Sequence, residues 1–387
     1  MDSHVRPAAG LSAPLIQWLI AYGTFAIPQA AGPIAFTLLA MPLTGSSSSG
    51  AVLVLAITVA QVAGAVPLVR LGAGRNAVSY LRVLLSVRAL ALVGMAALAK
   101  AEASFLFLVV AAALGGLVNG AAFGLLRSIL NHLAHPSGMP RALGMAATLN
   151  ELTFVAAPIA ASLLGTAIDP VVALVILVLL GTAPVVLVPA VPEATTPAPL
   201  RAGESLLRPA ILLWLACTLA TSAVTSAVEI GAVAIAINYG LAPAEGAIFA
   251  VALCIAAVAG GIWVSARNRA PGRRTVPLLL ALLCLGAILT ASNFSVIASL
   301  IGAVIIGCFL APLGTYNSLR LDALAPGPRK AEVFALSRTA NSLGIILTSA
   351  NLTWLPVETT MAISAAALLL VTLGVAVVTY AEHPSDR

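Results

Sequence analysis

Residues 171–188 read VVALVILVLLGTAPVVLV, an apolar run in which Thr182 has the only polar side chain. A helix needs about 20 apolar residues to cross the hydrocarbon core of a bilayer, because each residue advances it by about 1.5 Å. Every backbone polar group must be paired there, so such a run is expected to form a transmembrane helix. Similar runs fill almost the whole chain of 387 residues on both sides of this one. The sequence therefore encodes a polytopic membrane protein.

Gly, Pro and charged residues divide the apolar runs into twelve expected spans. We place them at 11–42, 50–70, 79–99, 104–128, 142–167 and 170–190, and then at 209–238, 245–266, 275–293, 295–320, 333–354 and 357–380. The longest polar interruption, VPEATTPAPLRAGESLLR at 191–208, separates the two sets of six. The sequence thus predicts an all-α integral membrane fold with 12 transmembrane helices in two pseudo-symmetric six-helix bundles, residues 1–190 and 209–387, joined by a cytoplasmic linker.

Basic residues occur in alternate gaps between the spans. The gaps after the even-numbered spans hold nearly all the arginines, whereas Lys100 is the one basic residue of the opposite gaps. Basic loops stay on the cytoplasmic side, so we expect both termini in the cytoplasm and the basic side chains near anionic lipid. The net charge of +6 then reports membrane orientation and argues against nucleic-acid binding. The excess of Arg and Ala is typical of a GC-rich bacterial genome, and indicates a bacterial plasma membrane.

Cysteine and histidine usage argues against a metal or redox role. Cys217, Cys254, Cys284 and Cys308 lie inside apolar runs without CxxC spacing, and the histidines lie in the tails or in one short loop. The sequence contains no Walker A segment, G-x-x-x-x-G-K-[ST], so ATP is excluded as a direct energy source. We expect no metal, no cofactor and no enzymatic activity, and a monomer whose partners are a small solute, protons and lipid.

Polar side chains are distributed unevenly among the expected spans. The sixth, ninth and twelfth spans are nearly bare and are expected to face lipid, and the third is bare after Arg82 and Arg88, which are expected to snorkel or pair near its cytoplasmic end. The remaining spans supply the expected solute contacts: Gln29, Asn119, Thr225, Tyr316, Asn317 and Asn341.

The seventh span has a polar stripe that ends in an acid. Thr218, Ser222, Thr225 and Glu229 are spaced by four, three and four residues, which places them on one face of a helix. For the hydroxyl groups alone, the favoured explanation is that they bond to backbone carbonyls and aid helix packing. This explanation does not cover the carboxyl group of Glu229, because it needs water or a partner.

Glu151 and Glu229 are the two acidic residues that lie well inside expected spans. A charge at the membrane centre costs about 3 kcal/mol or more, so such a residue faces the bundle interior or a cavity and is commonly functional. The carboxyl group can carry a proton near neutral pH, or hold a cationic solute when it is ionised. We predict that both acids take part in proton coupling. A structural pair is the alternative, with Arg127 as the partner of Glu151, and Arg127 is also a candidate gate residue.

Matched turns in the two halves resemble those of the major facilitator superfamily. The second span of each half is followed by a Gly-Arg pair, Gly74-Arg75 and Gly272-Arg273, which indicates an internal parallel repeat. In that family the first of these turns reads G-x-L-x-D-R-x-G-R-R. Here residues 67–76 read PLVRLGAGRN, so the glycine and the arginine match, while Leu71 takes the place of the acid.

A second motif of the same family is partly present in the fifth span. Residues 153–162 read TFVAAPIAAS, which is similar to the G-x-x-x-G-P-x-x-G-G segment of the family's antiporters, with Pro158 matching the proline. The resemblance implies alternating access, in which two bundles rock about a central site built mainly from the first, fourth, seventh and tenth spans. It also favours an exporter and assigns Gly74, Arg75 and Pro158 to gating.

These features together favour a secondary active transporter, most simply a proton-coupled exporter of a small amphipathic or cationic organic solute by antiport. Nutrient uptake by proton symport is the alternative, because these residues do not determine the direction of transport. A non-transporting receptor or scaffold is a further alternative. An integral membrane enzyme acting on lipid-linked substrates is disfavoured, because no cluster of His, Asp or Glu lies at one membrane surface.

Overall fold

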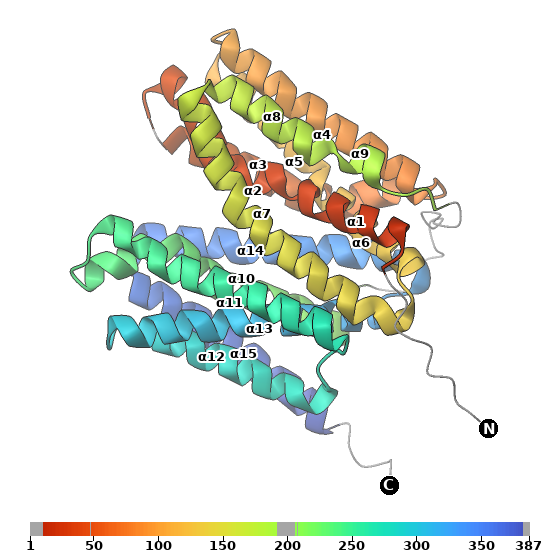
Figure 1. Ribbon diagram of the computed structural model, residues 1–387, viewed down its shortest axis with the longest axis vertical. Coiled ribbons are helices and arrows are strands. Elements are labelled where there is room, and N and C mark those ends of the chain that lie inside the picture. The colour runs from red at the N-terminus through yellow and green to blue at the C-terminus, as the bar shows by residue number, and fades with distance from the viewer. Residues whose placement is uncertain (1–10, 47, 192–205, 207, 382–387) are drawn as a thin grey trace.

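The computed structural model describes residues 11–46, 48–191, 206 and 208–381, and these ranges contain helices and no strand (Figure 1). The first half comprises α1 (Ala13–Phe25), α2 (Ile27–Thr44), α3 (Ser48–Leu71), α4 (Ala77–Lys100), α5 (Phe105–Leu117), α6 (Asn119–Leu133), α7 (Met139–Ala167), α8 (Pro170–Thr182) and α9 (Pro184–Leu187). The second half comprises α10 (Pro209–Asn238), α11 (Ala247–Arg267), α12 (Val276–Ala291), α13 (Val296–Leu324), α14 (Lys330–Trp354) and α15 (Val357–Ala381). Short 3-10 turns occur at Pro136–Gly138, Pro243–Gly246, Arg273–Thr275 and Gly327–Arg329. The all-α prediction is confirmed, whereas the predicted linker at 191–208 lies almost wholly outside the described residues.

Eleven helical segments of the described chain are long and apolar enough to cross a membrane. The remaining long helix, α14, is more polar and carries Arg338, Asn341 and Ser342. It lies against α10, α6 and α3 in the middle of the bundle, so these side chains are kept away from lipid (Figure 1). The twelve-helix fold is therefore confirmed, with one of its most polar helices at the centre.

Three of the predicted spans are bent. The chain breaks at Ala26 between α1 and α2, at Val118 between α5 and α6, and at Ala183 between α8 and α9. Pro28 and Pro184 follow the first and third breaks, because proline lacks the N–H that a helix interior needs but suits the first turn. Each of the expected spans 11–42, 104–128 and 170–190 therefore consists of two helical segments.

A single buried guanidinium binds at all three breaks. Arg88 on α4 is 4% exposed, and its Nη1 donates to the carbonyl oxygen of Phe25 (3.1 Å) and to Oδ1 of Asn119 (2.9 Å). Its Nη2 donates to the carbonyl oxygen of Gly181 (2.6 Å). Helix breaks leave carbonyl groups without intrahelical partners, and Arg88 supplies partners at the first and third breaks. At the second break it binds the side chain of Asn119 instead. Arg88 was expected to snorkel or to pair near the cytoplasmic end of its span. It does find partners, but in the interior at the middle of α4, so snorkelling is wrong.

Replacing Arg88 with leucine is expected to destabilise the fold by about 3 kcal/mol or more, because buried oxygen atoms lose charged donors. Thermal unfolding of the purified protein in detergent would measure this loss. Arg267→Gln is the matched control, since its guanidinium is exposed and stacks on Trp263 of its own helix. An Arg88→Leu protein as stable as the Arg267→Gln protein would contradict the role of Arg88.

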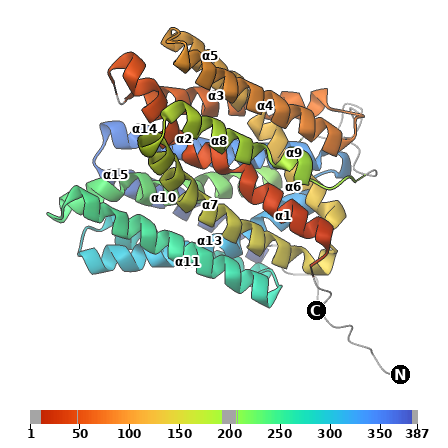
Figure 2. The same cartoon turned by 45° about the horizontal axis from the view of Figure 1, so that its top comes forward.

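The loops that carry the arginines lie at one end of the bundle. Because successive spans run in opposite directions, the α3–α4, α6–α7, α11–α12 and α13–α14 connections share an end with Ala13 and Ala381 (Figures 1 and 2). We call this end the basic face and the opposite end the far face. The alternation of charge along the sequence thus corresponds to a separation of the loops in space.

The two halves are joined in the central layer and at the basic face. There, the backbone N–H of Arg141 donates to Oδ1 of Asn268 (2.9 Å), and α7 packs so closely on α11 that a Cβ at Gly144 would lie 2.9 Å from the carbonyl oxygen of Gly261. Within the described residues, no hydrogen bond joins the halves at the far face, where α7 and α10 diverge (Figure 1). The structure is closed at the basic face and parted at the far face.

Candidate functional site

Two cavities lie between the halves at successive depths. The basic-side cavity has a volume of about 280 Å³ and is bounded by α1, α6, α7, α10, α11, α13 and α14. The far-side cavity has a volume of about 250 Å³ and is bounded mainly by α2, α3, α4, α6, α7, α10 and α14. Both approach the lower end of the range for small-molecule pockets, about 300 Å³. The centre of the bundle therefore has room for a small solute.

Eight of the predicted site residues line these cavities. The basic-side cavity is lined by Arg127, Glu151, Asn317 and Asn341. The far-side cavity is lined by Gln29, Asn119, Pro158 and Glu229. Residues that the sequence places on separate spans are thus brought together in two adjoining spaces.

Two of the predicted solute contacts line neither cavity. Tyr316 is 8% exposed and packs on Trp214 inside the second half, with the ring centres 5.4 Å apart. Thr225 donates to the carbonyl oxygen of Thr221 (2.9 Å), one turn earlier in α10. Its neighbour Ser226 lines the far-side cavity instead. The geometry gives no support for solute contact by Tyr316 or Thr225.

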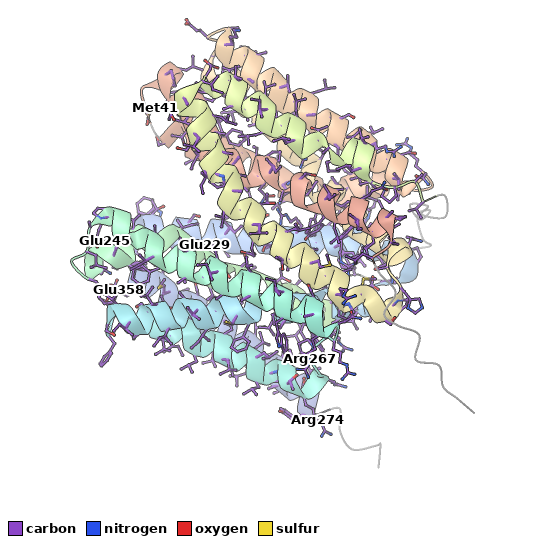
Figure 3. The ribbon with its side chains drawn as sticks, in the orientation of Figure 1. Met41, Glu229, Glu245, Arg267, Arg274 and Glu358 are labelled. Carbon is purple, nitrogen blue, oxygen red and sulfur yellow. The ribbon has the colours of Figure 1, made fainter. Side chains whose placement is uncertain are left out.

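The two acids predicted for proton coupling meet at the interface between the halves. Glu151 belongs to α7 of the first half. Glu229, labelled in Figure 3, belongs to α10 of the second. A carboxylate oxygen of each and Sγ of Cys254 on α11 all lie within 4.8 Å of one another. Glu151 lines the basic-side cavity and Glu229 the far-side cavity, so the pair lies where the cavities adjoin. The arrangement can hold a proton or a cation between two oxygen atoms.

The same three groups fit a structural metal site poorly. Zinc in such sites takes four protein ligands at about 2.0–2.3 Å. Here Glu151, Glu229 and Cys254 offer three ligand atoms, at spacings of up to 4.8 Å. Proton binding by the carboxyl pair needs no further ligand, and the geometry supports it better.

Hydrogen bonds cross the interface beside the far-side cavity. Asn119 on α6 donates to Oε1 of Gln61 (2.5 Å) and of Gln29 (3.2 Å), and Gln61 donates to Oγ of Ser342 on α14 (2.6 Å). Gln29 also accepts a hydrogen bond from Nη2 of Arg338. Gln29 lines the far-side cavity and Arg338 the basic-side cavity, so this bond lies between the two spaces. A solute that contacts Gln29 or Asn119 has to share or displace these bonds.

Arg127 does not pair with Glu151. Its Nε donates to Oγ of Ser318 on α13 (2.9 Å), and its Nη1 donates to Oδ1 of Asn131 (3.1 Å), one turn later in α6. Asn131 in turn donates to Oδ1 of Asp322 in the second half (2.5 Å). The alternative of a structural pair between Arg127 and Glu151 is wrong, because the guanidinium turns toward the basic face. Arg127 lies between the basic-side cavity and that face, where a gate residue is needed.

Several residues of the site were not among those predicted. Arg338 could have been found by the rule that singled out the two acids, because it is also a charge well inside a span. Gln61 is a lone amide in an apolar span, which is a weaker signal of the same kind. Cys254 had no signal, because its approach to the acids depends on how α11 packs against α7.

Comparison with known protein families decides the class of the chain. Residues 15–349 match the family model described as Major Facilitator Superfamily. The chain belongs to the major facilitator superfamily. It is therefore a membrane transporter and not an enzyme, and the predicted resemblance is confirmed.

Solved transporter structures share this superfamily fold over nearly the whole chain. A bacterial homologue of the iron transporter ferroportin, in an outward-facing state, has a TM-score of 0.73 at 15% identity, with 95% of this chain and 100% of that chain covered. The E. coli fucose:proton symporter FucP has a TM-score of 0.74 at 11% identity, with 95% of this chain and 99% of that chain covered. The human organic anion transporter MFSD10 (TETRAN) has a TM-score of 0.72 at 13% identity, with 94% of this chain and 98% of that chain covered. No curated protein sequence matches the chain. At these identities the likeness establishes the fold alone.

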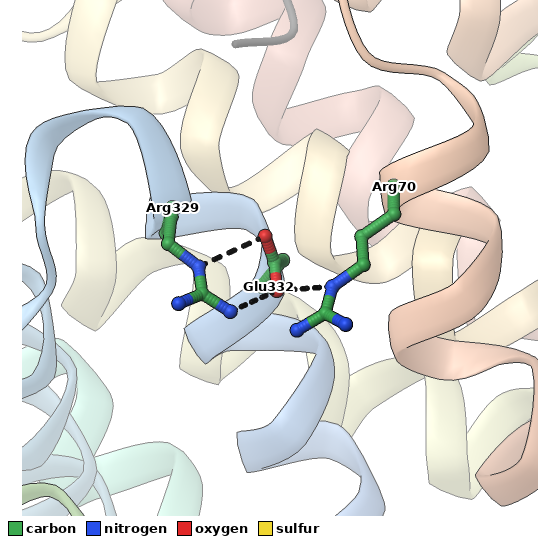
Figure 4. Close-up of polar contacts among 3 residues, drawn as sticks. All are labelled: Arg70, Arg329 and Glu332. Atoms are coloured by element: carbon green, nitrogen blue, oxygen red, sulfur yellow. Dashed lines mark hydrogen bonds and ion pairs between the residues drawn. The ribbon is translucent and has the colours of Figure 1, made fainter. Parts of the chain in front are cut away.

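The superfamily turn after the second span lies in the α3–α4 loop at the basic face. Gly74 has φ +77°, a conformation that favours glycine, and Arg75 stacks on Tyr80 of its own half at 5.7 Å. The ion pair to the second half comes instead from Arg70, whose Nε lies 3.0 Å from Oε2 of Glu332 on α14 (Figure 4). The acid that this turn lacks is thus supplied by the other half.

Glu332 lies between two guanidinium groups at the basic face (Figure 4). Nη2 of Arg329 lies 2.8 Å from its Oε2, opposite Arg70. Burial would raise the pKa of Glu332, but hydrogen bonds from Arg329 and Arg70 outweigh it and hold the pKa below the ordinary value of 4.5. An acid with a lowered pKa stabilises the fold above its unfolded pKa and loses this contribution as the pH falls through its folded pKa.

Replacing Glu332 with glutamine is expected to lower stability at pH 7 by about 1 kcal/mol, a modest value because the Arg70 side chain is 60% exposed and its attraction is screened. As the pH falls below 4.5, the wild type loses the same contribution and the two unfolding temperatures should converge. Thermal unfolding across this pH range measures the effect, with Glu245→Gln in an exposed loop as the control. A difference between wild type and variant that does not change with pH would contradict the assignment.

Proposed function

We propose that this chain is a proton-coupled secondary transporter that exports a small organic solute by antiport. One observation carries the proposal: Glu151 and Glu229 come from opposite halves, lie within 4.8 Å of each other, and line the two adjoining cavities. In alternating access the halves rock against each other around a central site. Groups on the two sides of the interface therefore approach and separate during the cycle.

Protonation of this pair is linked to the conformation of the bundle by charge repulsion. Two ionised carboxylates whose oxygen atoms lie within 4.8 Å of each other repel each other. A bound proton removes the repulsion and lets the halves stay together at this level, and its loss favours their separation. Because linkage is reciprocal, a conformational change that parts the acids also releases the proton.

The charge pattern supports an orientation that suits export. The basic face would lie toward the cytoplasm of a bacterium, in the plasma membrane, with both termini on that side. The structure would then be sealed toward the cytoplasm and parted toward the outside. Protons from outside would reach Glu229 through the far-side cavity. The solute would leave through the same opening, which is the arrangement that an antiporter needs.

The polar residues of the two cavities would contact the solute in turn. In the basic-side cavity these are Asn317 and Asn341, and in the far-side cavity Gln29 and Asn119. Pro158 lies inside α7 beside the far-side cavity, where it removes a backbone hydrogen bond and permits bending. Arg127 would act as a gate on the basic side.

The test begins with metabolite profiles of cells with and without the protein, which supply candidate solutes. Each candidate is then added to liposomes that contain the purified protein, with a pH gradient imposed in either direction. Antiport predicts solute accumulation when the lumen is acidic, because protons leave as the solute enters. Accumulation only when the bath is acidic would show symport. If no solute moves and a partner protein co-purifies, a receptor or scaffold replaces the proposal.

A further inference from the structure

A reciprocal stack of phenylalanine and arginine lines the basic-side cavity. Phe123 and Arg127 lie one turn apart on α6, and Phe334 and Arg338 have the same spacing on α14. The Arg127 guanidinium lies 4.4 Å from the centre of the Phe334 ring, and that of Arg338 lies 5.1 Å from the centre of the Phe123 ring. We call these four residues the arginine clasp. Each stack joins the halves, because α6 and α14 belong to different ones.

The clasp places two cations at one cavity without acidic partners. Neither guanidinium forms an ion pair within the described part of the chain. Arg127 is 3% exposed and its Nη2 has no hydrogen-bond partner; Nε of Arg338 also has none. Aromatic stacking leaves these N–H groups unsatisfied, because it uses the face of the guanidinium and not its edge. Burying a cation with unpaired N–H groups costs free energy unless an anion binds to these groups.

The other charged groups around the cavity do not supply that anion. Asp322, which Arg127 reaches through Asn131, already lies 2.8 Å from Nζ of Lys330. Glu151 lines the same cavity but lies beside Glu229, and a proton held by that pair reduces its charge. The cavity therefore has an excess of positive charge.

We propose that the basic-side cavity binds an anionic organic solute, with its carboxylate or phosphate group held by Arg127 and Arg338. This inference rests on the proposed transport function and specifies its substrate class. Guanidinium edges pair with such groups through charge-assisted hydrogen bonds, often two at a time. Tyr22, Thr218 and Asn341 line the same space and can bind the neutral part of the solute. The cationic solute expected from the acids alone is disfavoured by the two guanidiniums.

An anionic cargo also fits antiport with protons. Export of an anion removes negative charge from the cell, and import of a proton adds positive charge. Both movements make the interior more positive. A membrane potential that is negative inside therefore drives both movements. For a cation, export would run against that potential.

The test uses probes that share a shape and differ in charge: sodium benzoate and benzylamine hydrochloride, with sodium phosphate and sodium citrate as further anions. The purified protein is titrated with each in detergent at constant ionic strength, and the unfolding temperature is recorded. We expect at least one anion to raise it in a saturable way, and benzylamine to leave it unchanged. Arg338→Gln and Arg127→Gln should each weaken anion binding about tenfold or more. Arg267→Gln should leave it unchanged.

Two further measurements keep the result interpretable. Arg338→Lys retains the charge, so it should fold and bind the anion more tightly than Arg338→Gln, even if the glutamine variant is unstable. A panel in which no anion raises the unfolding temperature, or in which benzylamine does, overturns the proposal. Anion binding that survives both glutamine substitutions also overturns it.

Failure of this inference is distinguishable from failure of the transport proposal. Binding of an anion to a protein that moves no solute in liposomes would leave the anion site standing and remove the transport function. Proton-driven movement of a cation or a neutral solute would do the reverse.

Discussion

Replacing both Glu151 and Glu229 with glutamine is expected to abolish transport driven by a pH gradient, with a loss of about a hundredfold in solute accumulation. Glutamine keeps the size and polarity of the side chain but cannot gain or lose a proton in this range. The repulsion that links protonation to conformation therefore disappears. Solute exchange without a gradient should persist, because the cavities remain. The measurement is accumulation in liposomes with an acidic lumen, compared with counterflow at equal pH.

The single variants and a surface control sharpen this test. Glu151→Gln and Glu229→Gln should each weaken coupling, because either acid alone can still bind a proton but no longer faces a like charge. Glu245→Gln lies in an exposed loop of the second half, labelled in Figure 3, and should behave as the wild type. A double variant that still accumulates solute when the lumen is acidic would remove the carboxyl pair from the mechanism.

Replacing Gly144 with leucine is expected to prevent closure at the basic face. A Cβ at this position would lie 2.7 Å from Oγ and 2.8 Å from the backbone nitrogen of Ser265 on α11, closer than real contacts allow. Overpacking of this kind costs about 1–3 kcal/mol, which shifts a conformational equilibrium about tenfold to a hundredfold. Transport should fall by a similar factor, because the closed form described here becomes rare.

Distance measurements between spin labels would separate this effect from unfolding. Labels at His135→Cys and Arg269→Cys, in exposed loops of opposite halves, should move apart in the Gly144→Leu protein. Gly94→Leu is the matched control, because nothing lies within 4 Å of a Cβ there. An unchanged label distance with full transport in the Gly144→Leu protein would show that α7 and α11 need not pack this closely.

The sequence could predict the number of spans, but not that the two acids lie close together. Apolar length sets eleven of the spans directly, whereas the remaining span, α14, is more polar and is indicated by the alternation of basic loops as well. The rule that charges avoid lipid identified Glu151 and Glu229, but no pattern in one chain reports their mutual distance. That distance depends on how α7, α10 and α11 pack, as does the position of Cys254.

Errors in the sequence predictions come from the rotation of one helix and from helix breaks. The stripe on α10 was expected to include Thr225, whereas Ser226 lines the cavity, and one residue corresponds to about 100° of helix rotation. Arg88 was expected to snorkel or to pair near the cytoplasmic end of its span. The sequence around Arg88 does not show that breaks in other helices free carbonyl groups for it. Such tertiary partners override the local rule for arginine.

The tie formed by Arg88 limits which motions turnover can use. One side chain ties together the breaks in the first, fourth and sixth spans. These spans cannot straighten or bend independently without leaving carbonyl groups in the bundle interior unpaired. The first bundle is therefore expected to move as one rigid body. The speed of the transport cycle would then be set by the opening of the α6–α14 and α7–α11 seams, and tighter or looser packing along those seams would change it.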